Sequence, residues 1–400
     1  MTKKSDAPAI RFKGFSDAWE QRKLGELALF NPKDELPQTF EYVDLESVVG
    51  TEMLSHRTEV KSSAPSRAQR LAHTGDLFYQ TVRPYQKNNY LFEKPDNNYV
   101  FSTGYAQMRP YVDGYFLLSL VQSERFVKVV LDNCTGTSYP AINANDLAEI
   151  EVAAPSDESE AQKIGTIFRS IDNLITLHQR KFEKLTNVKK SMLEKMFPQN
   201  GSSYPEIRFK GFTDPWEQRK VGDLLIERNQ QAPMSDEYPL MAFIANEGVA
   251  PKGERYDRSA LVTDTVNKLY KKTEKGDFIY SSNNLETGSI GLNKYGKACI
   301  SPVYSIFEPT GIADSDFLGR RLVRKDFINA MVKWRQGVIY GQWRIHESDF
   351  LKIEITVPSV EEQRKIGTYL DQLDHLITLH QRELEKLQNI KKSMLEKMFV

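Results

Sequence analysis

The sequence repeats itself about half-way along the chain, and this duplication constrains the fold more than any other feature. The segment IRFKGFSDAWEQRKLGEL at 10–27 returns as IRFKGFTDPWEQRKVGDL at 207–224, with 14 of 18 positions identical. A longer segment at 160–197 returns at 362–399, with 26 of 38 positions identical. A repeat of this length indicates a duplicated domain rather than a stack of short structural units.

The longer repeated segment has the pattern of a long helix. Counted in heptads from Ile164, apolar residues recur at positions a, d and e, and Pro198 follows the first copy. Because the e positions widen the apolar stripe beyond what one partner helix covers, we expect the two copies to pair and to keep apolar surface for another protein. The alternative is that each helix packs only on its own domain. The residues assigned to this pairing and docking surface are Phe168, Ile171, Leu174, Ile175, His178, Phe182, Leu185, Leu370, Leu373, Leu376, Ile377, His380, Leu384 and Leu387.

Two histidines, His178 and His380, occupy a positions near the middle of the two copies. A polar side chain at an a position can fix the register of paired helices, and we favour this role over catalysis or metal binding. Antiparallel pairing would bring the two histidines close together. It would also place the head at 10–27 near the second half of the chain and relate the halves by a pseudo-two-fold axis.

The two stretches between the repeated segments share little sequence but have similar composition. Runs such as GDLFYQTV at 75–82 and GDFIYSS at 276–282 are typical of strands. Faint matches, such as Tyr79 with Tyr280, indicate one fold with two different surfaces. We therefore predict an α/β (α+β) chain with two similar domains and two long antiparallel coiled-coil helices. The predicted boundaries are 1–155 for the first domain with its head, 156–199 for the first helix, 200–358 for the second domain and 359–400 for the second helix.

Motifs for catalysis are missing from the sequence. Methyl transfer to a base would need an Asn/Asp-Pro-Pro-aromatic segment, and no Pro-Pro dipeptide is present. The stretch GLNKYGKA at 291–298 resembles a phosphate loop but has Ala298 in place of the hydroxyl residue that binds Mg²⁺. The 6 histidines show no metal-ligand spacing. The chain is therefore interpreted as a binding protein without catalytic residues or metal.

Basic, amide and aromatic side chains cluster in the two variable stretches. Arginine, asparagine and glutamine can read base edges while lysine contacts phosphate, so these clusters are predicted to contact DNA. The alternative is that they are solvated surface charges. Residues 28–155 carry 11 basic and 16 acidic side chains, so the affinity of the first domain would come from a local patch or from partners. The candidates are Arg67, Arg70, Arg83, Tyr85, Gln86, Lys87, Asn88, Asn89, Ser138, Tyr139, Lys268, Lys271, Lys272, Ser282, Asn283, Asn284, Arg320, Arg321, Tyr340, Gln342, Trp343 and Arg344.

Composition excludes several classes of protein. The only cysteines, Cys134 and Cys299, are too few for a disulfide framework or a cysteine-based zinc site. Basic and acidic residues number 54 each, so bulk charge identifies no partner. The longest apolar runs are far shorter than a membrane span, and no apolar core follows the first lysines. We expect a cytoplasmic chain that does not associate with membranes.

Taken together, the repeats resemble those of the DNA specificity subunits of type I restriction–modification enzymes. The resemblance covers essentially all 400 residues. It rests on the paired KKSMLEKMF helix ends, the WEQRK-(L/V)-G-(E/D)-L heads and the two divergent domains between them. The Lys-Ile-Gly segments that open the two helices, within 155–165 and 358–367, also belong to it.

The resemblance implies that two target recognition domains each read half of a bipartite site in double-stranded DNA. It implies that two methyltransferase subunits dock on the helices and modify adenine with S-adenosylmethionine. ATP-dependent restriction and translocase subunits, with Mg²⁺, would complete the enzyme. The chain itself would have no active site and would bind none of these cofactors. Because the two variable surfaces differ, the two half-sites should differ.

Other functions stay open at this point. The chain could be a scaffold that gathers proteins through its helices without touching DNA. It could be the recognition subunit of another methyltransferase or nuclease system. A complete enzyme with fused recognition domains is disfavoured, because no segment is left over for a catalytic domain.

Overall fold

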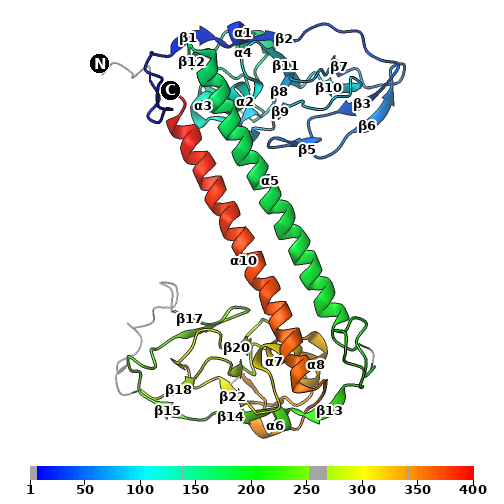
Figure 1. Cartoon of the computed structure of the whole chain (residues 1–400), viewed down its shortest axis with the longest axis vertical. Helices are drawn as coiled ribbons and strands as arrows, with labels where there is room; N and C mark the ends of the chain where they lie inside the picture. Colours follow the sequence, from blue (N-terminus) through cyan, green and yellow to red (C-terminus); the bar gives the residue numbers. More distant parts are fainter. Residues whose placement is uncertain (1–6, 137, 200, 252–267, 340–341) are drawn as a thin grey trace. The chain divides into compact units, whose positions relative to one another are not determined.

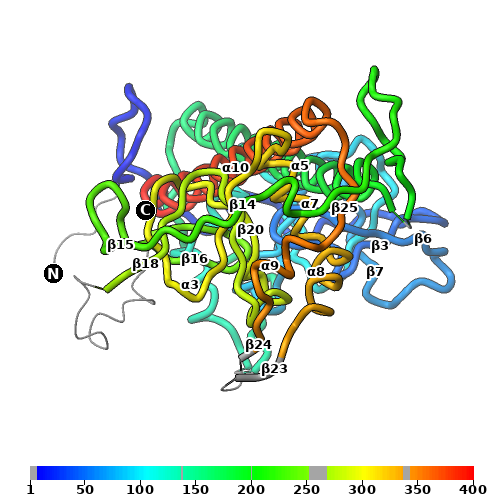
Figure 2. Tube along the Cα trace, turned by 90° about the horizontal axis from the view of Figure 1, so that it is seen from below, coloured from blue at the N-terminus to red at the C-terminus, as the bar shows by residue number. Residues whose placement is uncertain are grey.

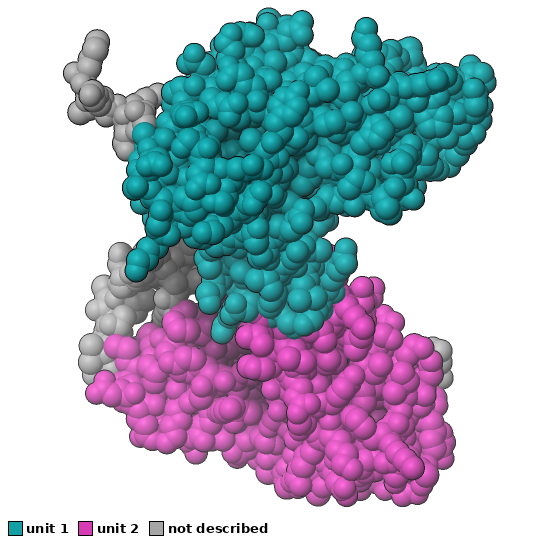
Figure 3. Space-filling view, turned by 45° about the horizontal axis from the view of Figure 1, so that its top comes forward, with its two compact units in different colours: residues 1–181, 380–400 teal, residues 182–379 magenta. Residues whose placement is uncertain are grey.

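The chain forms two compact units, shown in different colours in Figure 3. Unit 1 comprises Met1–Lys181 together with His380–Val400, and unit 2 comprises Phe182–Leu379. The computed structural model describes residues 7–136, 138–199, 201–251, 268–339 and 342–400.

Two long helices, α5 (Glu158–Lys195) and α10 (Val360–Lys397), have 38 residues each and are unbroken (Figure 1). Each helix therefore begins in one unit and ends in the other. Both have acidic residues in the first turn and a lysine in the last, which complements the helix dipole. The predicted pair of long helices is thus confirmed, with each helix shared between the two units.

Unit 1 contains two four-stranded sheets, ordered β6-β3-β10-β7 and β2-β11-β8-β9. Strand β10 runs parallel to β3, and the other pairs in these sheets are antiparallel. Strand β1 in the head pairs with β12, directly before α5. The strands are β1 (Glu20–Lys23), β2 (Ala28–Phe30), β3 (Thr39–Val43), β4 (Val48–Val49), β5 (Glu52–Met53), β6 (Arg57–Val60), β7 (Ala68–Leu71), β8 (Leu77–Gln80), β9 (Tyr90–Leu91), β10 (Tyr99–Ser102), β11 (Tyr105–Pro110) and β12 (Glu151–Ala154). The short helices are α1 (Leu24–Leu27), η1 (Pro84–Gln86), α2 (Gly114–Gln122), α3 (Glu124–Asp132) and α4 (Ala144–Ala148).

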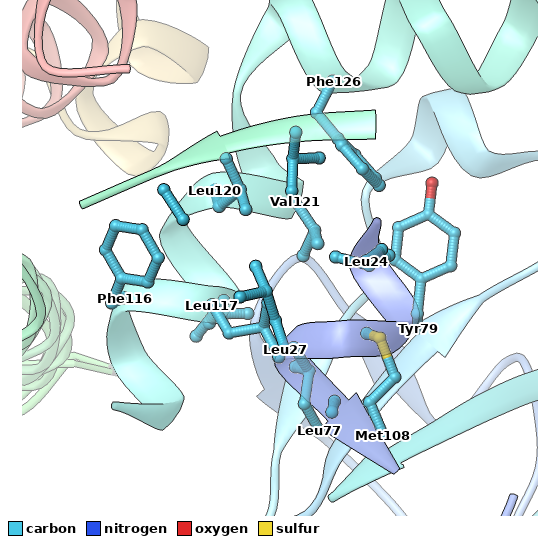
Figure 4. Packing of buried hydrophobic residues seen from close by; sticks show 14 of the residues in the cluster. Leu24, Leu27, Leu77, Tyr79, Met108, Phe116, Leu117, Leu120, Val121 and Phe126 are labelled. Atoms are coloured by element: carbon cyan, nitrogen blue, oxygen red, sulfur yellow. The ribbon is translucent and has the colours of Figure 1, made fainter. Parts of the chain in front are cut away.

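The alternation of side chains along β8 explains how one strand serves two cores in unit 1. Leu77 and Tyr79 point into a cluster with the apolar faces of α2 and α3, shown close up in Figure 4. Phe78 points to the opposite side and belongs to a separate cluster, where it stacks on Phe101 with ring centroids 3.6 Å apart. Side chains of a strand alternate between its two faces, so a strand between two cores is buried along its whole length, as β8 is.

Unit 2 repeats this plan with different residues. Its main sheet has the order β14-β22-β19-β20, beside a three-stranded sheet β15-β18-β21, and β13 pairs with β25 directly before α10. The hairpin of β23 and β24 projects from the rest of the unit (Figure 2). The strands are β13 (Glu217–Lys220), β14 (Leu225–Glu227), β15 (Gln231–Ala232), β16 (Ala242–Ile244), β17 (Gly248–Ala250), β18 (Tyr270–Thr273), β19 (Phe278–Tyr280), β20 (Ile290–Leu292), β21 (Ala298–Ile300), β22 (Ser305–Pro309), β23 (Gln336–Ile339), β24 (Gln342–Arg344) and β25 (Glu354–Val357). The helices are α6 (Val221–Leu224), α7 (Ser315–Arg321), α8 (Lys325–Val332) and α9 (Glu347–Phe350).

The end of one long helix completes the core of each unit. In unit 1, Phe399 after α10 packs on Trp19, Phe116 and Phe168, with ring centroids 5.8–6.2 Å apart. In unit 2, the equivalent Phe197 after α5 packs in the same way on a tryptophan of the head and a phenylalanine of α7. The end of α10 therefore lies against the beginning of α5 in unit 1, which confirms antiparallel packing of the helices within that unit.

Equivalent ion pairs repeat in the two units. Arg11 of the first head forms a two-pronged pair with Glu160 of α5, at 2.6 and 2.8 Å, and the carboxylate is fully buried. Arg208 of the second head pairs in the same way with Glu362 of α10, at 2.7 Å for both contacts. Such planar forks fix orientation as well as charge, so each head is locked to the first turn of its own long helix.

The glycine of the Lys-Ile-Gly segment is required by close packing. A Cβ atom at Gly165 would lie 1.8 Å from Oδ1 of Asp113, the carboxylate that caps the N-terminus of α2. A Cβ atom at Gly367 would lie 2.6 Å from Oδ1 of Asp314, which caps α7 in the same way. The repeated motif therefore marks the point where each long helix touches the cap of a domain helix.

The histidines at the a positions meet inside unit 1, as predicted. The Nδ1 atoms of His178 and His380 lie 3.0 Å apart, and the rings meet edge to face. One nitrogen must donate a proton and the other accept it, so the contact requires at least one neutral ring. Within the described residues, no helix is long and apolar enough to cross a membrane.

Candidate nucleic-acid interface

The loop after β8, residues 81–89, carries most of the predicted DNA contacts of unit 1. Arg83 and Lys87 both adopt the left-handed backbone conformation, with φ of 55°, and flank the single turn η1. This conformation costs a non-glycine residue about 1–2 kcal/mol, so the surrounding structure must hold the loop in place. The backbone N–H of Arg83 donates to the carbonyl of Pro140 at 2.8 Å and ties the loop to a second segment.

Several polar side chains of this loop bond inside the protein. Asn89 is 1% exposed, and its Oδ1 accepts a hydrogen bond from the backbone of Gln80 at 2.9 Å. Oδ1 of Asn88 accepts from the backbone N–H of Gly50, and Oε1 of Gln86 accepts from the Gln80 side chain, both at 2.8 Å. The prediction of a DNA contact is therefore wrong for Asn89, and Asn88 and Gln86 already use one acceptor each.

The side chains of Arg83 and Tyr139 lie against each other at this site. The guanidinium carbon of Arg83 lies 4.6 Å from the centroid of the Tyr139 ring. Tyr139 is 64% exposed and Tyr85 is 49% exposed, so both rings are available for contact with a ligand. Lys87 forms an ion pair with Glu124 at 2.7 Å. Ser138, beside Tyr139, is also exposed.

The remaining candidates of unit 1 lie at β7, in the other sheet. Arg67 is exposed, whereas Arg70 is half-buried. Burial lowers the pKa of Arg70 from its ordinary value, and its Nε has no hydrogen-bond partner among the described residues. The two arginines belong to a different sheet from the loop after β8.

In unit 2, the β23–β24 hairpin and the loop after β19 supply the corresponding aromatic and basic side chains. Trp343 is 44% exposed, and the guanidinium carbon of Arg335 lies 6.0 Å from its ring centroid. Arg335 also forms a two-pronged ion pair with Glu286, at 2.9 and 3.2 Å. Arg344 is largely exposed and approaches Glu347 only at 4.0 Å. Arg335 was not among the predicted contacts, although it lies in the second variable stretch, where basic and aromatic side chains were predicted to contact DNA.

Three predicted contacts of unit 2 are engaged within the protein. Arg320 pairs with Asp374 of α10 at 2.9 Å, and Arg321 pairs with Asp326 of α8 at 2.9 Å. The Arg321 side chain is only 13% exposed, and this burial lowers its pKa. Lys271 on β18 is buried. The structure contradicts these three predictions, because buried or paired cations are not available to DNA phosphates.

Other candidates of unit 2 keep some exposure. Lys268 is exposed, and the ammonium group of Lys272 lies 3.9 Å from the centroid of the Tyr238 ring. Oγ of Ser282 accepts a hydrogen bond from the backbone of Ile345 at 3.0 Å. Asn283 is half-buried and Asn284 is exposed. Gln342 pairs through its backbone with Ile339 in the hairpin, and Tyr340 lies outside the described residues.

The long helices carry exposed leucines at equivalent positions. Leu174 and Leu177 in unit 1 are 44% and 46% exposed, and Leu376 and Leu379 in unit 2 are 40% and 45% exposed. The heptad analysis missed Leu177 and Leu379, because they occupy g positions. These four residues are called the outward leucines below.

The predicted docking surface requires a correction. Phe168 and Leu370 are fully buried in the cores of unit 1 and unit 2, so the prediction that a partner covers them is wrong. Ile171 and Leu373, one turn further on, are also buried. The remaining residues of the e and a columns are half-buried: Ile175, Phe182, Leu185, Ile377, Leu384 and Leu387.

The described residues contain no group of three or more histidine, cysteine, aspartate or glutamate side chains that could hold a metal ion. Cys134 is half-buried and Cys299 is buried, and both are free thiols.

Comparison with known proteins agrees with this architecture. The family described as the type I restriction modification DNA specificity domain matches this chain twice, at residues 17–187 and 213–389. The MjaVIII type I restriction enzyme specificity subunit of Methanocaldococcus jannaschii is 25% identical over 307 residues, which cover 71% of this chain and 68% of that protein. The MjaIX specificity subunit of the same organism is 22% identical over 301 residues, covering 71% and 67%.

A solved structure shares the fold. The type I restriction-modification system S subunit from M. genitalium has a TM-score of 0.61 with 16% sequence identity, over 98% of this chain and 99% of that chain. The two matches of the family span both copies of the head, the variable domain and most of each long helix. The chain therefore belongs to the family of type I restriction–modification DNA specificity subunits.

Proposed function

We propose that this chain is the DNA sequence-specificity subunit of a type I restriction–modification complex. The observation that carries the proposal is the contrast between a repeated frame and two different exposed surfaces. The heads, the buried ion pairs and the helix ends recur in both units, whereas the outward aromatic and basic residues do not. A protein that must present two different readers on one frame has this pattern of repetition and divergence.

Each domain is assigned one half of an asymmetric, bipartite site in double-stranded DNA. In unit 1 the contacts are assigned to Arg83 and Tyr139, with the exposed Tyr85 in the same loop and the exposed Arg67 beside the other sheet. In unit 2 they are assigned to Trp343 and to the cations that remain exposed, Arg344 and Lys268 among them. Arginine reads guanine edges and lysine contacts phosphate, so these surfaces can supply both specificity and affinity.

The outward leucines are assigned to the docking of methyltransferase subunits. The same exposed pair, separated by three positions, occurs once in each copy of the helix segment LITLHQR. Two equivalent docking surfaces support a complex with two methyltransferase subunits. Adenine methylation with S-adenosylmethionine, and restriction or translocation with ATP and Mg²⁺, are assigned to those partners and not to this chain.

The experiment that tests this function uses the chain together with its methyltransferase partner. Adenine methylation mapped across a bacterial genome should reveal one bipartite motif with two different halves. Replacing residues 28–155 with the equivalent segment of a relative should change one half-site and leave the other half and the spacer unchanged. Methylation without any sequence motif would contradict the proposal, and failure of the complex to bind DNA would favour the protein scaffold instead.

A further inference from the structure

The loop after β8 is preformed rather than free to adapt. It contains two non-glycine residues in the left-handed conformation, and its turn is closed by backbone hydrogen bonds from Gln86 to Arg83 and from Lys87 to Pro84, both 3.0 Å. The side chain of Gln122 on α2 donates to the carbonyl of Lys87 at 3.0 Å. Strain of this kind persists only where the surroundings hold it, and it is concentrated at sites where a particular geometry is needed.

Tyr139 comes to this loop on a separate segment. The backbone N–H of Ile142 donates to the carbonyl of Thr81 at 3.0 Å, and Val82 forms a β-bridge with Ala141. With the bond from Arg83 to Pro140, these contacts fix the position of the tyrosine relative to the arginine. The guanidinium carbon of Arg83 lies over the Tyr139 ring, and the N–H groups of this guanidinium have no hydrogen-bond partner among the described residues.

Arg83 also differs from the other stacked arginines in its charge partners. Arg57 stacks on Tyr42 at 4.7 Å but forms ion pairs with Asp44 and Glu59 at 2.7 and 2.8 Å. Arg335 in unit 2 is likewise bound to a carboxylate, that of Glu286. Among the described residues, no carboxylate lies within ion-pair distance of Arg83. Its five N–H donors are therefore oriented by the stack but not satisfied by the protein.

We propose that Arg83 reads a guanine in the major groove of the half-site bound by unit 1, and that Tyr139 is the positioning residue that sets its guanidinium plane. Guanine presents two acceptors, O6 and N7, whose spacing matches the two parallel donors of an arginine fork. A stacked arginine loses less rotamer freedom on binding than a free one, so the contact is preorganised. This inference rests on the proposed function and specifies one base of its recognition sequence.

The test uses the complex of the full-length chain with its methyltransferase subunit and a library of randomised DNA duplexes. Bound duplexes are sequenced, and affinity is then measured for the preferred site and for variants at each position. For Arg83→Ala we expect a loss of preference for guanine at one position of one half-site, of roughly 5- to 150-fold. The other half-site should be selected as before.

Two conservative variants distinguish base reading from a phosphate contact and from a structural role. Arg83→Lys keeps the charge but replaces the stacked fork with a single ammonium group, so its guanine preference should be weaker than that of the wild type; a lysine variant with the full wild-type preference would overturn the proposed role of the stacked fork. Tyr139→Leu should weaken the same preference and Tyr139→Phe should retain it. Equal losses in both tyrosine variants, or no loss in either, would refute the positioning role.

The matched control is Arg57→Ala, which removes a stacked arginine of the same unit whose charge is already paired. It should leave the selected sequence unchanged. If Arg83→Ala weakens binding equally for every sequence, the residue contacts phosphate and the proposal is wrong. If the wild-type complex selects no sequence at all, the proposed function fails as a whole, and this outcome is distinguishable from failure of the Arg83 assignment alone.

Discussion

The outward leucines provide the most direct test of how the chain recruits its catalytic partner. Full burial of a leucine side chain contributes about 1.5–3 kcal/mol. Because Leu174 and Leu177 still expose 44% and 46% of their surface, covering the remainder is worth roughly 1 kcal/mol for each leucine. Replacing both with serine should therefore weaken methyltransferase binding at this site by about 2 kcal/mol, or roughly 30-fold.

The second pair, Leu376 and Leu379, should behave in the same way at the other docking surface. Each pair is assigned to its own docking surface, so the fourfold variant should bind each of two methyltransferase subunits about 30-fold more weakly, and the overall association constant for binding both should fall roughly a thousandfold. Titration of purified methyltransferase subunit, followed by calorimetry or analytical ultracentrifugation, gives both affinity and stoichiometry. A thermal melt of each free variant verifies that it is folded at the assay temperature.

The experiment needs a control variant with an exposed leucine outside the proposed docking surface. Leu29→Ser changes a leucine of strand β2 that is 44% exposed and is not part of the long helices, and it should leave partner binding unchanged. Unaltered methyltransferase affinity in the fourfold variant would show that the partner docks elsewhere. An equal loss from Leu29→Ser would show that the measurement reports general loss of apolar surface.

Three further predictions concern the frame. Arg11→Ala leaves the buried carboxylate of Glu160 unpaired and should lower the free energy of unfolding by about 3–5 kcal/mol; urea titration checks this, and adding Glu160→Gln should restore part of the loss. The pKa of His380 is lowered, first by burial and then by the charge of His178, so the unfolded chain binds more protons and stability should fall as the pH drops below about 6.5. Urea midpoints measured against pH should show this slope in the wild type and lose it in His380→Asn. Gly165→Ala should destabilise the first domain by displacing the cap of α2, as seen in faster amide hydrogen exchange at the start of that helix.

The duplication allowed most of the architecture to be predicted from sequence. Internal identity defines the repeated frame directly, and the helix predicted at 156–199 contains the whole of α5, which ends at Lys195. Strand composition located β8 and β19, and both are fully buried because their side chains alternate between two cores. These features depend on the order and spacing of residues along the chain, which can be read directly from the sequence.

The sequence could not show which of the candidate DNA-contact residues are free to reach DNA. Arg320 resembles a free cation in sequence, but its carboxylate partner Asp374 is 54 residues away and belongs to a different helix. Asn89 carries an amide of the kind that can read a base edge, but its side chain is buried within the loop after β8. Which polar group finds a partner depends on contacts between distant segments, and neither charge pattern nor turn composition reports them.

The heptad pattern also could not distinguish between two kinds of apolar surface. Phe168 and Ile175 both occupy e positions, yet the first completes the core of its own unit and the second is half-buried along the helix. The apolar stripe continues along the whole helix, but different groups cover it at different points along its length. The stripe predicts burial, and only the tertiary structure identifies the covering group.

The two LITLHQR segments take part in the same two kinds of contact. His178 meets His380, and one of the two rings must donate a proton to the other across 3.0 Å. The outward leucines of the two copies are exposed to a similar degree, from 40% to 46%, which the proposed docking of one kind of partner at two places would require. A substitution in one copy would therefore change the histidine pair or make the two proposed docking surfaces unequal. The loop that carries Arg83 and the hairpin that carries Trp343 take part in neither contact, so the recognition surfaces proposed for them can differ while the repeated helix segments stay alike.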